Sequence, residues 1–162
     1  MTKELTDRFL AALAAAGVRA RAAYPAEKAV RPAAPETTVS LEKASALPAG
    51  LGGYLGALDD PETGPRALCG RRLEAVFRLR VASPVSLGGE GCAAEADRVM
   101  DALLAGIDGM ELRAFSAEPC GFDPGTDCFF CVLRAEMRAL LYALPASADE
   151  TVGDFELEGE LH

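Results

Sequence analysis

Two long stretches that alternate apolar and charged residues constrain the fold of this chain most. In residues 73–81 apolar side chains occupy every odd position, and Glu74, Arg78 and Arg80 stand at even positions. Residues 129–139 repeat the pattern, with charged side chains at positions 134, 136 and 138. A period of two is typical of a β-strand with one buried face. The sequence therefore predicts a sheet with one apolar face and one charged face.

Two other segments have the spacing of amphipathic helices. Residues 2–16 carry apolar side chains three and four apart and end at Gly17, and a second stripe follows the glycines of residues 88–91. The apolar positions are Leu5, Phe9, Leu10 and Leu13 in the first helix and Ala96, Val99, Met100, Leu103 and Ile107 in the second. Two helices are too few to cover both faces of a parallel sheet. We therefore expect an α+β fold, with a mixed or mainly antiparallel sheet and the N-terminal and central helices packed on one face.

Shorter alternating segments predict further strands at residues 18–24, 37–46 and 110–117. Between two of the strands, residues 48–66 contain five glycines, which disfavour both a helix and a strand ladder. We expect a long, mobile, Gly-rich loop there. Residues 1–146 are expected to form a single domain, followed by an acidic segment, residues 147–162, that is either a C-terminal tail or an edge strand.

The charge balance excludes some partners. Sixteen basic residues against 25 acidic ones give a formal net charge of −9, which disfavours nucleic acid or an anionic membrane as a partner. No apolar run reaches the roughly 18 to 20 residues that span a bilayer, and the charged N-terminus does not resemble a signal peptide. We expect a cytoplasmic protein.

Catalytic signatures are missing from the sequence. The one histidine, His162, is the last residue, and no nucleophile elbow, zinc-protease or phosphate-loop motif occurs. A nucleophile normally requires a base within hydrogen-bonding reach. The sequence therefore favours a protein that is not an enzyme and that uses no cofactor.

The five cysteines form an odd set in a chain without a secretion signal, so reduced thiols are favoured over a disulfide framework. Cys128 and Cys131 have the CxxC spacing of zinc and redox sites, and Cys120 is a third candidate ligand. Residues three apart on a strand point to opposite faces, and no second CxxC completes a tetrahedron. Buried or exposed thiols are therefore the stronger interpretation, with a metal site as the alternative.

The order of elements resembles the tail-terminator group of phage and prophage tail-assembly proteins. The resemblance covers a Gly-rich segment, Leu51-Gly52-Gly53-Tyr54-Leu55-Gly56, then the strand at 73–81, Ser83-Pro84 and a helix that begins with glycines. It implies an α+β subunit that closes into a ring, commonly a hexamer, and binds other tail or head-completion proteins in the host cell or the virion. It also implies that the loop at 48–66 becomes ordered on assembly.

The arginines on the charged strand faces are candidates for the contact between subunits, because arginine is enriched at interfaces. An ordinary solvated sheet face explains the same pattern. The candidate interface residues are Arg78, Arg80, Arg134 and Arg138, together with Tyr54 and Leu55 of the Gly-rich segment. Two alternatives to an assembly role stay open: a cytosolic cysteine-based metal-binding or redox module, and a small-ligand regulatory domain.

Overall fold

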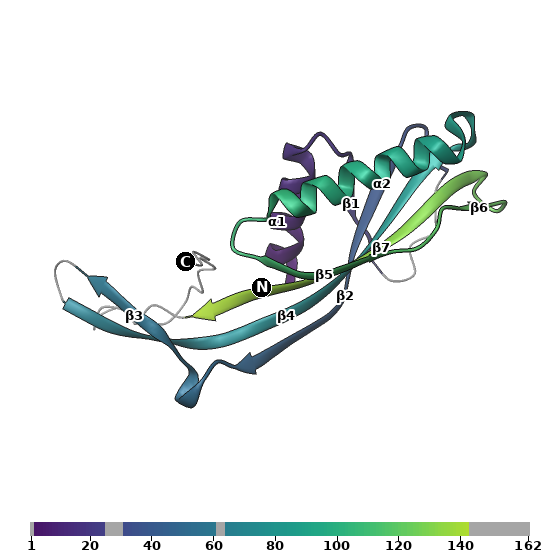
Figure 1. Ribbon diagram of the computed structural model, residues 1–162. Helices are drawn as coiled ribbons and strands as arrows, with labels where there is room; N and C mark the ends of the chain where they lie inside the picture. The colour runs from purple at the N-terminus through teal and green to yellow at the C-terminus, as the bar shows by residue number, and fades with distance from the viewer. Residues whose placement is uncertain (1, 25–30, 61–63, 143–162) are drawn as a thin grey trace.

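The structure is a computed structural model that describes residues 2–24, 31–60 and 64–142. Over these residues it is an α+β fold in which two α-helices lie against a twisted sheet (Figure 1), which confirms the predicted fold class. The elements in chain order are α1 (Thr2–Ala15), β1 (Ala20–Ala22), β2 (Glu36–Pro48), the 3-10 helix η1 (Leu51–Gly53), β3 (Tyr54–Asp60), β4 (Gly64–Pro84), the 3-10 helix η2 (Val85–Leu87), α2 (Gly88–Ala105), β5 (Glu111–Ala117), β6 (Gly121–Asp123) and β7 (Cys128–Tyr142).

The strands form one mixed and mainly antiparallel sheet. Its main path runs in the order β1-β2-β4-β7-β5, with β3 paired to β4 and β6 paired to β7. β1 is parallel to β2, and the other pairs are antiparallel. β4 spans 21 residues, and it pairs with β3 along its first part and with β2 and β7, one on each edge, along the rest. The chain thus uses one long strand to connect all parts of the sheet.

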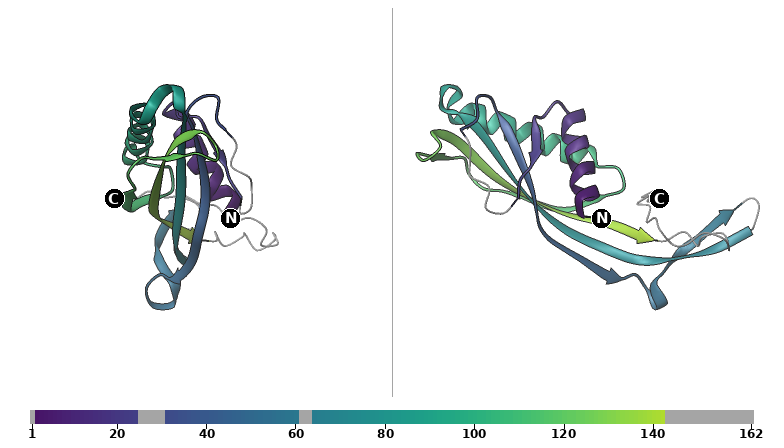
Figure 2. Two further views of the ribbon diagram at one scale, coloured as in Figure 1. Left: turned by 90° about the vertical axis from the view of Figure 1, so that its right-hand side faces the viewer. Right: turned by 180° about the vertical axis from the view of Figure 1, so that it is seen from behind.

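Both helices cover the same face of the sheet, and the core lies between them (Figure 2). Phe9 of α1 packs on Phe77 of β4, with ring centroids 4.5 Å apart. Val99 of α2 and Leu133 of β7 are fully buried in the same cluster. The odd positions of β4 and β7 supply the sheet side of this core, as the period-two pattern predicts. Removal of these apolar side chains from water is the main term that stabilises the fold.

The first helix ends where the sequence predicts. Gly17 has a φ of +74°, a conformation that glycine adopts without the penalty of a Cβ. Its N–H donates to the carbonyl of Ala14 at 2.9 Å, and the N–H of Val18 donates to that of Leu13 at 2.9 Å. These two bonds form a Schellman ending, which satisfies carbonyls that the helix leaves unpaired.

The prediction of a long loop at residues 48–66 is wrong. The described part of this segment forms η1, β3 and the start of β4, and β3 pairs with β4 from Tyr54–Cys69 to Asp60–Gly64. Glycine lowers strand propensity, but a two-stranded ladder still pairs the backbone groups. Gly56 stands at a register shift in the ladder, with a φ of 154°. The glycines thus mark irregularities within a hairpin instead of a loop.

We call this β3–β4 hairpin the arm, defined as residues 51–60 and 64–69. β2 ends its pairing with β4 at Arg71, and β7 ends at Gly70, so within the described residues the arm has two strands alone. Figures 1 and 2 show the arm extending past the helices at one end of the sheet. The expected domain limit at residue 146 and the acidic residues 147–162 lie outside the described residues.

Candidate interaction surfaces

The sheet face turned away from the helices is charged, and a β-bulge organises its centre. Arg78 of β4 and Arg134 of β7 are direct cross-strand neighbours. The carboxylate oxygens of Glu42 lie 3.9 Å from Nε of Arg78 and 3.3 Å from Nε of Arg134. A register shift between Leu41 and Lys43 makes Glu42 the extra residue of β2. One carboxylate therefore offsets the repulsion between two opposed guanidinium groups.

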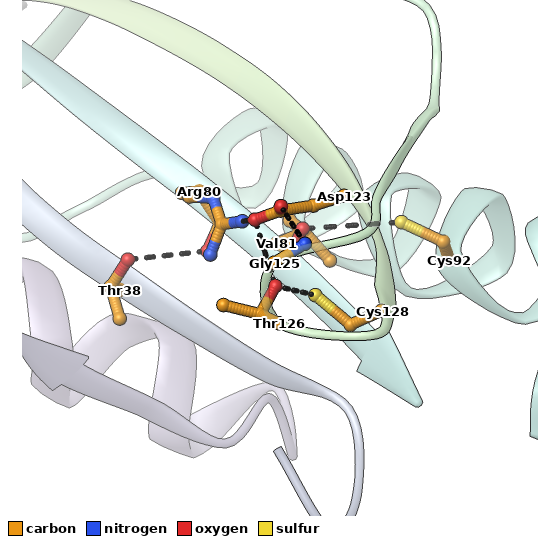
Figure 3. Close-up of polar contacts among 8 residues, drawn as sticks. All are labelled: Thr38, Arg80, Val81, Cys92, Asp123, Gly125, Thr126 and Cys128. Carbon is orange, nitrogen blue, oxygen red and sulfur yellow. Dashed lines mark hydrogen bonds and ion pairs between the residues drawn. The ribbon is translucent and has the colours of Figure 1, made fainter. Parts of the chain in front are cut away.

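The other two candidate arginines also have carboxylate partners within the chain. Nη1 of Arg138 lies 3.6 Å from Oε2 of Glu111, and Nη2 of Arg80 lies 3.1 Å from Oδ2 of Asp123 (Figure 3). The guanidinium of Arg80 also lies 4.9 Å from the ring centre of Phe130. Partly exposed pairs of this kind each stabilise a protein by about 1 kcal/mol or less. The structure thus places all four arginines on the outer face, each within 4.0 Å of one of three carboxylates that sequence reasoning did not identify.

At one end of this outer face, Asp123 binds three groups: Thr126, Gly125 and Arg80. Oγ1 of Thr126 donates a hydrogen bond to Oδ2 of Asp123 at 2.8 Å, and the N–H of Gly125 donates to Oδ1 at 3.0 Å (Figure 3). These hydrogen bonds, followed by the charge of Arg80, lower the pKa of Asp123 below its ordinary value of 3.8. The carboxylate is therefore ionised at neutral pH and joins the turn after β6 to β4.

The arm carries exposed apolar side chains, including one of the two predicted contact residues there. Tyr54 is 52% exposed, and Leu51, which sequence reasoning did not select, is 98% exposed. Leu55, the other predicted residue, is half-buried because it packs over Gly70, where a Cβ would lie 2.7 Å from its Cδ1. Tyr54 and Leu51 are thus available to a partner, whereas Leu55 holds the base of the arm.

A second set of exposed apolar side chains lies at the opposite end of the sheet: Val85 and Leu87 in η2, and Phe122 in β6. Cys128, the first residue of β7, pairs with Pro84 and with Asp123. Because η2 follows Pro84 and β6 ends at Asp123, both elements lie at this end of the sheet. Figures 1 and 2 show that this end and the arm lie far apart along the sheet. We call Val85, Leu87 and Phe122 the end patch. The sequence pattern does not predict the end patch, because its residues come from two segments that are distant in the sequence.

The three candidate metal ligands do not form a set. Cys131 faces the helices, whereas Cys128 contacts Thr126, with 3.0 Å between Sγ and Oγ1. Within residues 2–24, 31–60 and 64–142, no group of three His, Cys, Asp or Glu side chains has a geometry that could hold a metal ion. The period-two argument that separates Cys128 from Cys131 agrees with this arrangement.

Cys131 instead gathers with Cys120 and with Cys92 of α2. Sγ of Cys131 donates to the carbonyl of Glu118 at 3.1 Å, and Sγ of Cys92 lies 3.9 Å from the carbonyl of Val81, which pairs with Cys131 across the strands. Burial, followed by the neighbouring Cys120 thiol, raises the pKa of Cys92 to about 12 and that of Cys131 to about 11. Cys92 was missed at the sequence level, although its spacing to Ala96 and Val99 continues the buried stripe of the helix.

Two comparisons of the sequence with known proteins gave no match. Its sequence matches no protein-family model, and a search of curated proteins finds no significant similarity. In the part of the chain that the structure describes, neither α-helix has the length and apolar content needed to cross a membrane.

Proposed function

We propose that this chain is a structural assembly subunit, not an enzyme, and that copies of it join head to tail into a ring, as the resemblance to phage tail terminators implies. The observation that carries the proposal is the arm. It extends from the sheet as a two-stranded ribbon, and it exposes Leu51 and Tyr54. Its partners would then include a second copy of the chain and other tail or head-completion proteins.

A two-stranded hairpin without cover is at best marginally stable in water. The arm has exposed side chains on β3 and at Pro65, Ala67 and Cys69 of β4, and within the described residues neither α1 nor α2 makes more than a slight contact with β3. Strand edges without a partner also promote association with another chain. Contact with a neighbouring subunit would supply the apolar cover and backbone pairing that the arm does not receive from the described residues of its own copy.

The end patch offers the matching surface. Apolar side chains at two opposite ends of one subunit suit a heterologous contact, in which the arm of one copy meets the end patch of the next. A heterologous contact that closes by rotation gives a ring. The four arginines of the outer face already have carboxylate partners within the chain, so this contact would not require charge pairs between subunits.

The test is the mass in solution, measured by size exclusion with light scattering over a wide concentration range. We expect a ring-sized or concentration-dependent oligomer for the wild type, and a monomer for Tyr54→Asp and for Phe122→Asp. Leu104→Asp is the matched control, because Leu104 is 69% exposed in the last turn of α2, outside both surfaces. An unchanged mass for the Tyr54 variant would contradict the role of the arm.

Mixing the two interface variants separates a head-to-tail contact from a two-fold one. The Tyr54 variant keeps an intact end patch, and the Phe122 variant keeps an intact arm. If the contact is head to tail, an equal mixture restores one interface and gives a dimer that cannot grow. A wild-type protein that stays monomeric at every concentration and binds stoichiometric zinc would instead support a cysteine-based metal module.

A further inference from the structure

Cys120 lies across from Cys131 at the junction of β5 and β6. Two residues before Cys120, the N–H of Glu118 donates to the carbonyl of Val132 at 2.8 Å. Directly after Cys120, Gly121 pairs with Phe130. The register therefore leaves residues 119–120 opposite Cys131, as in a β-bulge, and the thiol of Cys120 neighbours that of Cys131. Opposed residues of antiparallel strands have Cα atoms about 4.5–5.5 Å apart, so neighbours of this kind can reach the range of about 4.4–6.8 Å that a disulfide requires.

The two thiols differ in access. Cys120 is exposed, and Cys131 is buried beneath α2. Both are reduced in this structure, and Cys131 donates its S–H to the carbonyl of Glu118. An exposed thiol next to a buried one is the arrangement in which the first reacts with a small oxidant and the second resolves the product.

We propose that Cys120 and Cys131 form a reversible cross-strand disulfide, and that this pair is a thiol modification site independent of the arm. The oxidant is a low-molecular-weight disulfide. The thiolate of Cys120 attacks one of its sulfur atoms, which forms a mixed disulfide and releases one small thiolate. The thiolate of Cys131 then attacks Sγ of Cys120, which forms the protein disulfide and releases the second small thiolate. The protein loses two electrons and two protons, and the small disulfide becomes two thiols.

Cys131 is the partner, and not Cys92, because of where the two side chains are held. The thiols of both residues neighbour that of Cys120. Cys131, however, is on the strand that runs beside Cys120, whereas Cys92 is on α2 with Sγ directed to the carbonyl of Val81. Burial raises the pKa of Cys131, and the second step needs its thiolate, so the rate of that step should rise as the pH rises. The disulfide would link the residue before β6 to β7, and would thus hold β6 against β7.

The test uses the full chain with Cys69→Ser, since Cys69 is exposed in the arm and could cross-link copies. The reduced protein is treated with oxidised glutathione, followed by thiol counting and peptide mapping under non-reducing conditions. We expect the loss of two thiols, a peptide pair that joins Cys120 to Cys131, and full reversal by a dithiol. Adding Cys120→Ser should abolish the loss, and adding Cys92→Ser should leave it unchanged.

Three results would overturn the proposal: a peptide pair that joins Cys120 to Cys92, a glutathione adduct at Cys120 that persists at alkaline pH, or no loss of thiols. Because Cys120 is exposed, its serine variant is expected to fold. Mapping the Cys69→Ser protein itself identifies the partner even if substitution of the buried Cys131 prevents folding.

Discussion

The two halves of β4 show how one strand can be held in two different ways. From Leu73 to Val81 its odd positions are buried under the helices, and β2 and β7 pair with both of its edges. From Gly64 to Cys69 it pairs with β3, and its described side chains are exposed or half-buried. The first half draws its stability mainly from apolar burial, and the second mainly from backbone pairing.

This difference explains why the first half has a clear sequence signal and the second has none. Burial of one face selects alternating residues, because each inward position loses contact with water. A ribbon that is open on both faces places no such demand on its side chains. The arm is therefore the part of the molecule whose stability is most open to change by a partner. The predictions below test this contrast, starting with the largest expected effect.

We call the two α-helices and the part of the sheet outside the arm the body. The stability of the body should depend strongly on single buried side chains. Replacing Phe77 with alanine removes the ring that packs on Phe9 at 4.5 Å and leaves a cavity in the core. We expect a loss of about 3–5 kcal/mol in the free energy of unfolding, measured by urea denaturation. Val76→Ala, one residue away on the outer face, should cost about 1 kcal/mol or less. Equal losses for the two variants would contradict the claim that one face carries the stability of the body.

The joint between body and arm should depend on Gly70. A Cβ at this position would overlap the carbonyl oxygen of Leu141 and lie 2.7 Å from Cδ1 of Leu55. We expect Gly70→Ala to cost about 1–3 kcal/mol and to increase hydrogen exchange of the arm amides more than that of the body. Gly89→Ala is the control, because a Cβ there meets Phe129 at 3.7 Å, an ordinary contact. Equal exchange in arm and body would show that the two are one cooperative unit.

The outer face of the body is exposed to water, as the arm is. Its ion pairs should therefore contribute little to the free energy of unfolding. Glu42→Gln leaves Arg78 and Arg134 opposed without a carboxylate between them. We expect a loss of about 0.5–1 kcal/mol at low salt, measured by urea denaturation. High salt should remove most of the difference, because it screens exposed charges. A loss that persists in high salt would show that Glu42 acts through packing and not through charge.

The smallest effect should appear as a dependence on pH. The folded state lowers the pKa of Asp123 below 3.8, so its carboxylate stabilises the fold above that pH, and the contribution disappears as the pH falls through the lowered pKa. Wild type should therefore exceed Asp123→Asn in stability near neutral pH, and the difference should shrink below about pH 4. Denaturation midpoints over this range measure it, with Asp101→Asn as an exposed control. A constant difference would contradict a role for the charge.

Part of the candidate surface was predictable from the sequence and part was not. Alternation places Arg78, Arg80, Arg134 and Arg138 on one face because parity alone decides the side of a strand. It does not identify Glu42, whose position depends on a β-bulge where two strands of different length are paired. The end patch and the neighbouring positions of Cys92, Cys120 and Cys131 escape sequence reasoning for a related reason. Their members come from separate elements, and no local pattern records which elements meet.

By itself the sequence determined the class of the fold, because the periods of the two helices and the main strands follow from which side chains must leave water. The Gly-rich segment shows where that reasoning ends. Residues 48–66 have no apolar period, and whether they form a loop or an arm depends on pairing between β3 and β4, with Leu55 packed over Gly70. Backbone hydrogen bonds are the same for every residue, so they leave little trace in the sequence. Tertiary structure alone decided that this segment extends the sheet, and which thiols and which charges lie side by side.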